Sequence, residues 1–496
     1  MIWKSFLGGV GLVVLVLVAA ILFNTLNVES QSVPGPSTQA AIAIDESVAA
    51  IRLAQAVQYR TVSVSSDMPA AGAAFRGLHE YLEASFPRVR DTLMRETING
   101  YSLLYTWQGK DTSLKPILLA AHMDVVPVEP GTEDDWLHPP FAGKIADGFV
   151  WGRGTMDMKA AIFGILEAIE YLIGRGFTPD RTVYLAFGHD EEIGGNQGAA
   201  KIAELLDQRG VKLAFTLDEG LVVTEGILPG IDQPVAVIGI AERGFVNLKV
   251  TASGLGGHGS MPPSSSAIGR LGRALALLEA NPMPAALRPP VTDMFDHVMA
   301  EMNFMTRLVF ANRWLLEPVI LRKLAEKPST NALIRSTAAI TVVAGGVKPN
   351  VIPQTADAIV NVRLLPGDTA ASVIDHLRRV IDDPGIAITI VRGTNQEASP
   401  VSDTSSSDYR ALASATRQVF PDALVAPGLM IGATDTPHYL DLADNSFRFQ
   451  PLRMTSDDVS RFHGTNERIA IDNFADIIRF YVYVLCNDRV PEAARC

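Results

Sequence analysis

TVYLAFGHDEE, residues 182–192, joins a strand-like apolar run directly to an imidazole and three carboxylates. Two similar apolar runs flank it in the sequence, ILLAA at 117–121 and LAFTL at 213–217, and helix-like stretches separate the three runs at 158–176 and 198–210. Short apolar strands that alternate with helices are typical of a parallel sheet with right-handed crossovers. The sequence therefore predicts an α/β fold with a mostly parallel sheet.

Each of the three apolar runs ends in chemically active residues. His122 and Asp124 follow the first run, residues 189–192 follow the second, and Asp218 follows the third. Asp157 opens the first crossover helix, which begins at the same edge of the sheet. Ligands of such sheets bind outside the carboxyl ends of the strands. We therefore expect these side chains to gather at one edge.

Charge and cysteine content restrict the chemistry. The chain has 54 acidic and 42 basic residues, without any Lys/Arg-rich run, which argues against nucleic acid or an anionic lipid surface as the working partner. Its only two cysteines, Cys486 and Cys496, cannot build a thiolate cluster, so any metal must be held by histidines and carboxylates. Such ligands suit zinc, and manganese or cobalt are tolerable substitutes.

Six residues are candidates for a two-metal centre. Two divalent ions about 3.5–4 Å apart need one bridging carboxylate and about two further ligands each. Five of the candidates satisfy that requirement, and one carboxylate remains to act as a general base. The six are His122, Asp157, Glu191, Glu192, Asp218 and the late histidine His463, in RFHGTNE at 461–467.

From residue 242 the pattern changes to strand, helix, strand, strand, helix and strand. This order is typical of a ferredoxin-like arrangement and predicts a second domain inserted into the first at 242–393. Between its first helix and second strand lies a long segment, 281–337, rich in Met, Phe, Trp and Leu. A cap over a hydrophobic pocket, an oligomer contact and a membrane-surface patch all agree with that composition.

The N-terminus contains an uncharged apolar run of 18 residues, Phe6 to Phe23, which is long enough to span a bilayer. Lys4 precedes it, and no Lys or Arg follows until Arg52. We expect an uncleaved single-pass anchor with the rest of the chain on the extracytoplasmic side; a cleaved signal peptide and a buried core helix are the alternatives. The expected segments are an anchor at 1–28, a flexible stalk at 29–44, a catalytic domain from 45–241 and 394–496, and a lid domain at 242–393.

Several motifs of the chain resemble one enzyme family. They are AAHMDVVPV (120–128), WLHPPFAGKIADGFVWGRGTMDMK (136–159), FGHDEEIGG (187–195), TLDEG (216–220), GGHGSMPP (256–263), GGVKPNVIPQTADAIVNVRLLPGD (345–368) and FHGTNE (462–467). They look like the dinuclear-zinc metallopeptidase family of carboxypeptidase S, aminoacylase and glutamate carboxypeptidase. The likeness runs from about residue 45 to the end of the chain, and it is strongest to the branch of carboxypeptidase S and the N-fatty-acyl-amino-acid hydrolase/synthase.

The resemblance implies a role for each candidate residue. Two Zn²⁺ ions would be bridged by Asp157, with His122 and Asp218 completing one site and Glu192 and His463 the other. Glu191 would be the general base, and Asp124 would hold the His122 ring in place. The remaining roles concern the substrate: His258 would reach the developing oxyanion, in this family often from a partner subunit, and Asn350, Arg363 and Gly432 would line the substrate side.

The function that the resemblance implies is hydrolysis of an amide bond beside a free C-terminal carboxylate. The first reading is a carboxypeptidase that releases C-terminal residues from short peptides, and the alternative is an N-fatty-acyl-amino-acid hydrolase/synthase, which the apolar insert would suit. A catalytically silent member that only binds a ligand is the non-enzyme alternative; the intact set of six residues argues against it. A homodimer through the lid is also implied.

Overall fold

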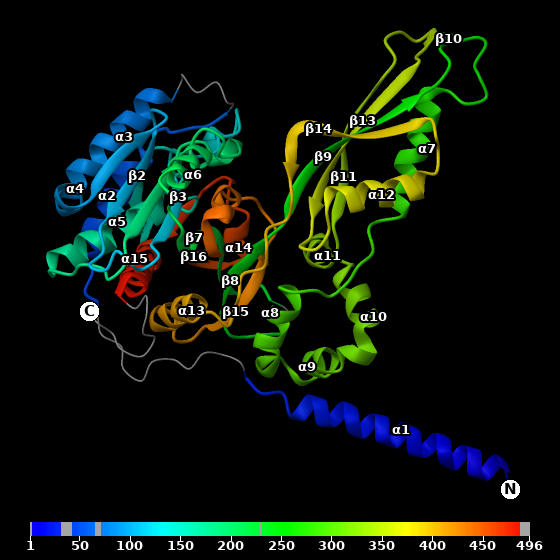
Figure 1. Cartoon of the computed structure of the whole chain (residues 1–496), viewed down its shortest axis with the longest axis horizontal. Coiled ribbons are helices and arrows are strands. Elements are labelled where there is room, and N and C mark those ends of the chain that lie inside the picture. The colour runs from blue at the N-terminus through cyan, green and yellow to red at the C-terminus, as the bar shows by residue number, and fades with distance from the viewer. Residues whose placement is uncertain (1, 31–41, 65–70, 229, 487–496) are drawn as a thin grey trace.

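The computed structural model describes residues 2–30, 42–64, 71–228 and 230–486. It contains an α/β unit, a second unit with its own sheet, and an N-terminal helix, α1 (Ile2–Leu26), which lies beside the insert (Figure 1). The stalk expected at 29–44 falls largely outside the described residues, because positions 31–41 are not among them.

The α/β unit is built on an eight-stranded sheet of order β1-β2-β6-β3-β7-β16-β8-β15. Its strands are β1 (Met94–Ile98), β2 (Ser102–Trp107), β3 (Ile117–His122), β6 (Val183–Gly188), β7 (Leu213–Glu225), β8 (Val235–Glu242), β15 (Leu424–Met430) and β16 (Ala443–Thr455). The neighbours β6, β3, β7 and β16 run parallel, but β1–β2, β2–β6 and β16–β8 are antiparallel. The sheet is therefore mixed, which corrects the expectation of a mostly parallel one.

Short connections explain two antiparallel pairs, β1–β2 and β7–β8. β1 and β2 are joined at Asn99 and Gly100, whose φ angles of 47° and 86° suit the tight turn of a hairpin. β7 ends at Glu225 and β8 begins at Val235, which leaves fewer residues than the dozen or so that a parallel crossover needs. The Asn-Gly pair is a hairpin signal that the strand–helix alternation alone does not register.

Helices cover both faces of this sheet. One face packs against α2 (Glu46–Val57), α3 (Gly72–Ser85), α4 (Pro87–Thr92), α5 (Lys159–Gly174), α13 (Ser407–Val419) and α15 (Ile471–Cys486), and the other against α6 (Ala199–Gln208) and the 3₁₀ segment η4 (Thr436–Leu442). A small sheet, β4 (Lys144–Ala146), β5 (Phe149–Trp151) and β17 (Arg468–Ala470), lies beside them, and α14 (Ser456–Val459) follows β16. The β5–β17 pairing brings the loop of His463 next to the loop of Asp157.

The second unit is an antiparallel sheet of order β11-β13-β9-β14 with α7 (Ala267–Ala280) and α12 (Ala370–Ile381) packed on one face. Its strands are β9 (Gly244–Ser253), β11 (Thr337–Gly345), β13 (Thr355–Leu364) and β14 (Ile386–Gln396), and β10 (Gly257–His258) pairs with β12 (Val351–Ile352) at its tip. Figure 1 shows this unit projecting from the α/β unit. Its role as a lid stays a prediction.

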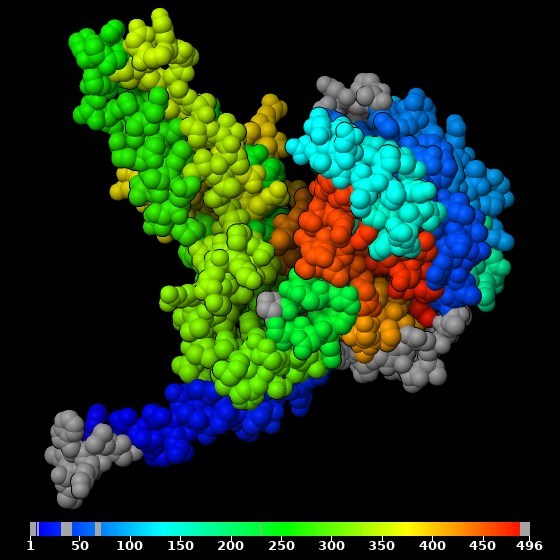
Figure 2. All heavy atoms as spheres, turned by 180° about the vertical axis from the view of Figure 1, so that it is seen from behind, coloured from blue at the N-terminus to red at the C-terminus, as the bar shows by residue number. Residues whose placement is uncertain are grey.

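The insert forms four helices, α8 (Val291–Val298), α9 (Phe304–Ala311), α10 (Arg313–Leu324) and α11 (Pro328–Ile334). Met294, Val298 and Met302 pack against β8 and β15 of the main sheet, in a buried cluster with Val237 and Ala426. In Figure 2 α1, in dark blue, runs along the light-green insert. The insert therefore lies between the eight-stranded sheet and α1.

One buried histidine of the α/β unit makes its stability depend on pH. His79 of α3 is 7% exposed, and its Nε2 lies 2.8 Å from the carbonyl oxygen of Tyr101. Burial lowers the pKa of His79 from 6.5 to about 4. The unfolded chain therefore binds one more proton between these two pH values, so stability is complete above pH 6.5 and is lost as the pH falls toward 4.

We expect His79 alone to remove about 2 kcal/mol of stability between pH 7.5 and pH 5. Urea unfolding in EDTA at both pH values measures the loss, which should be smaller by that amount in His79→Gln. His258 is exposed, so His258→Gln is the matched control. It should lose as much stability between the two pH values as the unchanged chain does. An equal loss in His79→Gln would show that His79 is protonated equally in both states.

Candidate active site

The carboxyl ends of β3 and β6 and the middle of β7 carry the candidate site. β3 ends at His122, and β6 ends at Gly188, directly before the segment that contains Glu191 and Glu192. β7 does not stop at Leu217, where the sequence led us to end it, but continues through Asp218 to Glu225. Because β6, β3 and β7 are parallel neighbours, these residues meet at one edge of the sheet.

Asp157 lies between two histidines. Its Oδ1 is 3.0 Å from His122 Nε2, and its Oδ2 is 2.6 Å from His463 Nε2. His122 Nδ1 lies 3.0 Å from the Asp124 carbonyl oxygen, which can only accept, so Nε2 is left to face the carboxylates. A carboxylate that presents one oxygen to each of two imidazoles has the arrangement of a ligand shared between two metal ions.

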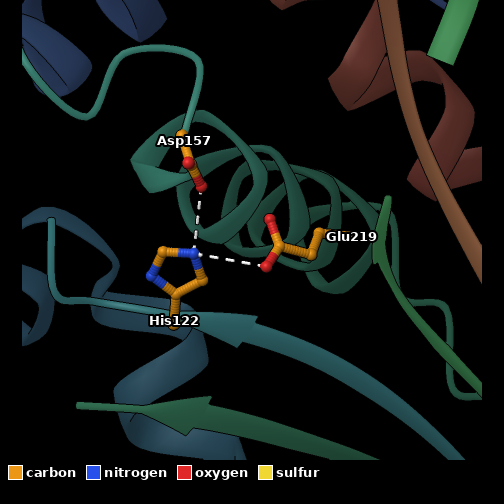
Figure 3. Close-up of side chains that lie close together, drawn as sticks. All are labelled: His122, Asp157 and Glu219. Atoms are coloured by element: carbon orange, nitrogen blue, oxygen red, sulfur yellow. Dashed lines mark hydrogen bonds and ion pairs between the residues drawn. The ribbon is translucent and has the colours of Figure 1, made fainter. Parts of the chain in front are cut away.

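Glu219, rather than the predicted Asp218, joins this group. Glu219 Oε1 is 3.4 Å from His122 Nε2, and Figure 3 shows both Glu219 and Asp157 directed at that nitrogen. Asp218 instead accepts hydrogen bonds from the Thr436 hydroxyl at 2.9 Å and from the Glu219 backbone N–H at 2.9 Å.

The backbone of β7 explains why Glu219, and not Asp218, faces His122. Successive side chains of a strand point to opposite faces, so Asp218 and Glu219 cannot both face His122. The pairing of β7 with β16 also shifts here: Asp218 is opposite Arg448, and the next pair is Leu221 with Phe449. Glu219 and Gly220 are thus left unpaired in a bulge, a device that redirects side chains beside active sites.

Glu191 and Glu192 form one turn of 3₁₀ helix after β6. The Asp124 carboxylate accepts from the backbone N–H groups of both residues, each at 3.2 Å. Glu192 Oε2 is 3.5 Å from His463 Nε2, and Glu191 Oε2 is 4.0 Å from His122 Nε2. The two carboxylates therefore face different histidines of the same cluster.

Burial makes the carboxylates of this cluster hard to ionise. Burial, reinforced by the neighbouring Glu219, raises the pKa of Glu191 well above its ordinary value. Burial and the charge of Asp157 raise the pKa of Glu192 to about 7, and burial raises the pKa of Glu219 to about 8. For Asp157, the hydrogen bonds of His122 and His463 outweigh burial and lower its pKa. So many buried acids need positive charge nearby.

The donor set fits divalent cations. Three groups of residues bring their ligand atoms within 4.8 Å of one another: His122, Asp157 and Glu219; His122, Glu191 and Glu192; Asp157, Glu192 and His463. Glu192 Oε1 is buried and has no hydrogen-bond partner among the described residues, although buried polar atoms normally have one. Imidazole nitrogens and carboxylate oxygens at such spacing suit zinc.

Glu467 supports the cluster from beneath, and the sequence analysis assigned it no role. It is fully buried and accepts from the Met156 backbone N–H at 2.8 Å and from the Asp157 backbone N–H at 3.2 Å. Arg153 donates to Glu467 at 2.7 Å and to the His463 carbonyl oxygen at 3.0 Å. This ion pair ties the two loops that hold Asp157 and His463. In the sequence, Glu467 is the last residue of the motif FHGTNE, and this position was the signal that could have identified it.

Two of the residues predicted to contact substrate, His258 and Asn350, lie at the β10–β12 pair of the second unit. His258 is exposed on β10 at the tip of the second unit (Figure 1), and its neighbour Gly259 donates a backbone hydrogen bond to Asn350. Arg363 lies on β13 with its guanidinium over the Phe245 ring. Gly432 follows β15, near Thr434 and Thr436 in the sequence. The structure thus gathers every predicted ligand except Asp218, whose neighbour Glu219 joins the cluster instead, and it does not bring His258 and Asn350 to them.

Comparison with known proteins gives consistent matches. A family model described as "Peptidase family M20/M25/M40" matches residues 118–487. A probable carboxypeptidase S-like protein of Dictyostelium discoideum is 44% identical over 440 residues, which cover 88% of this chain and 84% of that protein. The N-fatty-acyl-amino acid synthase/hydrolase of Xenopus tropicalis is 41% identical over 443 residues, covering 88% and 85%.

The fold also matches a solved structure. The M20 family metallo-carboxypeptidase Sso-CP2 from Sulfolobus solfataricus has a TM-score of 0.60 and 17% sequence identity, and the match covers 89% of this chain and 99% of that one. At this identity the match concerns the fold, which extends over both the α/β unit and the second unit.

Proposed function

Because the chain belongs to peptidase family M20/M25/M40 and is a metallohydrolase of that family, we propose that it is a zinc-dependent carboxypeptidase that releases C-terminal amino acids from short peptides. The observation that carries the proposal is the buried cluster around Asp157, whose two oxygens face His122 and His463 and whose other acids are left without matching positive charge. A site for two ions beside an uncommitted carboxylate is suited to hydrolysis of an amide.

Two Zn²⁺ ions per chain are proposed, with Mn²⁺ or Co²⁺ as substitutes. His122, Asp157, Glu192 and His463 would hold them, and the remaining ligand would come from the adjacent pair Asp218 and Glu219, of which Glu219 is within reach. When bound, such ions polarise a carbonyl group and make water more acidic.

The chain's own residues would perform the remaining steps. Glu191 would accept a proton from the attacking water and pass it to the leaving amine. Asp124 would fix the turn that carries Glu191 through its two backbone hydrogen bonds. The Arg363 guanidinium would bind the free carboxylate of the substrate. Loop donors around Gly432 would orient the same end.

His258 is proposed to act across a homodimer. It is exposed at the tip of the second unit, where it could enter the site of a second copy, and β11 is an edge strand whose Val342 and Val343 are exposed. An exposed apolar edge is a usual place for strand pairing between chains. The mass of the detergent-solubilised chain measured by light scattering tests this proposal.

A second candidate function is hydrolysis or synthesis of N-fatty-acyl amino acids. A specific observation favours it: the catalytic sheet is packed against an apolar insert that contacts a helix, Gly9–Leu26, long and apolar enough to cross a membrane. We propose that this helix is a single-pass anchor with the catalytic part on the extracytoplasmic side. N-fatty-acyl amino acids are amphiphilic and partition into membranes, so an enzyme anchored in the membrane would lie close to them.

The experiment that separates the two functions compares paired substrates. The full chain, loaded with Zn²⁺ in detergent, is assayed for amine release from a blocked dipeptide and from a long-chain fatty-acyl amino acid that share one C-terminal residue. Faster dipeptide turnover supports the carboxypeptidase, and faster acyl turnover supports the second candidate. Glu191→Gln is the blank in both arms. Release from neither substrate would refute both.

The choice between Asp218 and Glu219 gives a separate prediction. Glu219→Gln should reduce bound zinc to about one ion per chain. The substitution removes a carboxylate ligand from a site that needs four ligands. Asp218→Asn should retain both ions, because its carboxylate accepts from Thr436 and from its own backbone turn. Metal analysis after dialysis measures both variants. The reverse result would return the ligand role to Asp218.

A further inference from the structure

A buried amide, Asn312, makes hydrogen bonds between the insert and α1. Asn312, between α9 and α10, is 0% exposed. Its Nδ2 lies 3.2 Å from the Ile21 carbonyl oxygen and 3.2 Å from Thr25 Oγ1, and its Oδ1 accepts from Asn24 Nδ2 at 3.2 Å. A buried polar group needs such partners, so the end of α1 is docked at a defined position rather than lying loosely against the insert.

The position of these contacts along α1 sets the height of the insert. The apolar segment Gly9–Leu26 has a length of about 27 Å at 1.5 Å per residue, which matches a hydrocarbon core of about 30 Å. If Leu26 ends the span, the Ile21 contact lies about 7 Å inside that end. Helices that lie in a membrane interface are buried by about 5–10 Å. The insert contacts α1 at that same depth.

The two helices beside Asn312 expose several large apolar side chains. Met305 of α9 is 67% exposed and Trp314 of α10 is 59% exposed, and Leu315 and Val319 are exposed as well. α9 contains no fully buried residue. Trp314 also lines the groove between the insert and the end of α1. Tryptophan is enriched where membrane meets water, so this composition agrees with the depth derived from α1.

The insert is also packed against the eight-stranded sheet. The Phe295 ring of α8 packs against the Phe310 ring of α9 in a tilted arrangement with ring centroids 4.2 Å apart, and Met294 and Val298 of α8 pack on β8 and β15. Any surface that holds α9 and α10 therefore also fixes the orientation of the catalytic sheet.

We propose that α9 and α10 form a docking platform that seats on the bilayer which α1 enters, with Asn312 as the contact that clamps α1 to it. The bilayer is the occupant because α9 of the platform contacts α1, and the insert lies directly beside the apolar helix (Figure 2). This inference rests on the proposed anchor. It gives the insert a role in placing the catalytic edge at a fixed height above the membrane.

The test uses the full chain, loaded with zinc and reconstituted in phosphatidylcholine vesicles. A fluorescent amino acid replaces Met305, or in a second sample Leu315, and nitroxide groups on the upper acyl chains act as quenchers. The matched control carries the same fluorophore at Leu137, which is 72% exposed on the α/β unit. We expect quenching at 305 and 315 at least about twofold greater than at 137.

Asn312→Ala should bring quenching at 305 down to the level at 137, with dipeptide hydrolysis retained as the check on folding. Asn27→Ala is its control, because the Asn27 side-chain amide, directly after α1, donates to the Phe23 carbonyl oxygen of α1 and makes no hydrogen bond to the insert among the described residues. Resistance to alkaline carbonate reports the anchor separately. Carbonate-resistant chain without quenching at 305 and 315 would refute the platform alone. Extraction by carbonate would refute both the anchor and the platform, while hydrolysis would still report the enzyme.

Discussion

Glu191→Gln is expected to lower kcat for amide hydrolysis by about 10³-fold, with both metal ions retained. Glu191 is the acid of the cluster that is farthest from an imidazole, 4.0 Å from His122 Nε2, whereas Glu192 and Glu219 lie closer to their histidines. Its carboxylate is thus the one available to accept a proton. The glutamine side-chain amide has the same shape as the carboxylate but cannot accept the proton. The hydrolytic step should therefore be lost, while metal and substrate binding are retained.

The measurement is steady-state kinetics together with zinc analysis on the same samples. KM should change little, because Glu191 acts in the reaction step and not in holding the substrate. Glu80→Gln, on the exposed face of α3, is the matched control and should retain full activity. A Glu191→Gln chain that keeps more than about a tenth of wild-type kcat would remove Glu191 from the role of base.

Much of the site followed from the ends of strands. The apolar runs before His122 and Glu191 became β3 and β6, which are parallel neighbours, so their polar ends meet as expected. Strands and crossover helices each have a characteristic local periodicity of apolar residues, which can be read directly from the sequence. The same reasoning placed Asp157 at the start of α5, since a crossover helix begins at that edge.

What the local pattern missed depends on pairing between distant segments. The direction of Glu219 follows from the bulge that β7 makes against β16, more than two hundred residues later in the chain. Glu467 reaches Asp157 because β17 pairs with β5. Each of these contacts joins segments that are far apart in the chain. A local stretch of sequence therefore shows no pattern that predicts it. The insert at 281–337 likewise leaves three readings open, because its composition alone does not distinguish a cap, an oligomer contact and a membrane-surface patch.

Asp157→Asn is expected to remove both metal ions and with them the activity. Asp157 is the one residue whose two oxygens face both histidines, at 3.0 Å and 2.6 Å, and it is buried. An amide presents only one acceptor oxygen and no charge, so one histidine would face an N–H group. Loss of one partner from a buried charged cluster costs about 3–5 kcal/mol, which corresponds to a decrease in metal affinity of about 10²–10³-fold or more.

Zinc binding followed by competition with a chromophoric chelator measures this affinity directly, independently of turnover. Asp134→Asn, in an exposed acidic turn outside the cluster, is the matched control and should bind as the unchanged chain does. Because Asp157 would serve both ions, its loss should weaken both together, whereas loss of Glu219 or His463 should weaken one. An Asp157→Asn chain that keeps one ion at full affinity would mean that the two sites are independent and that Asp157 belongs to only one of them.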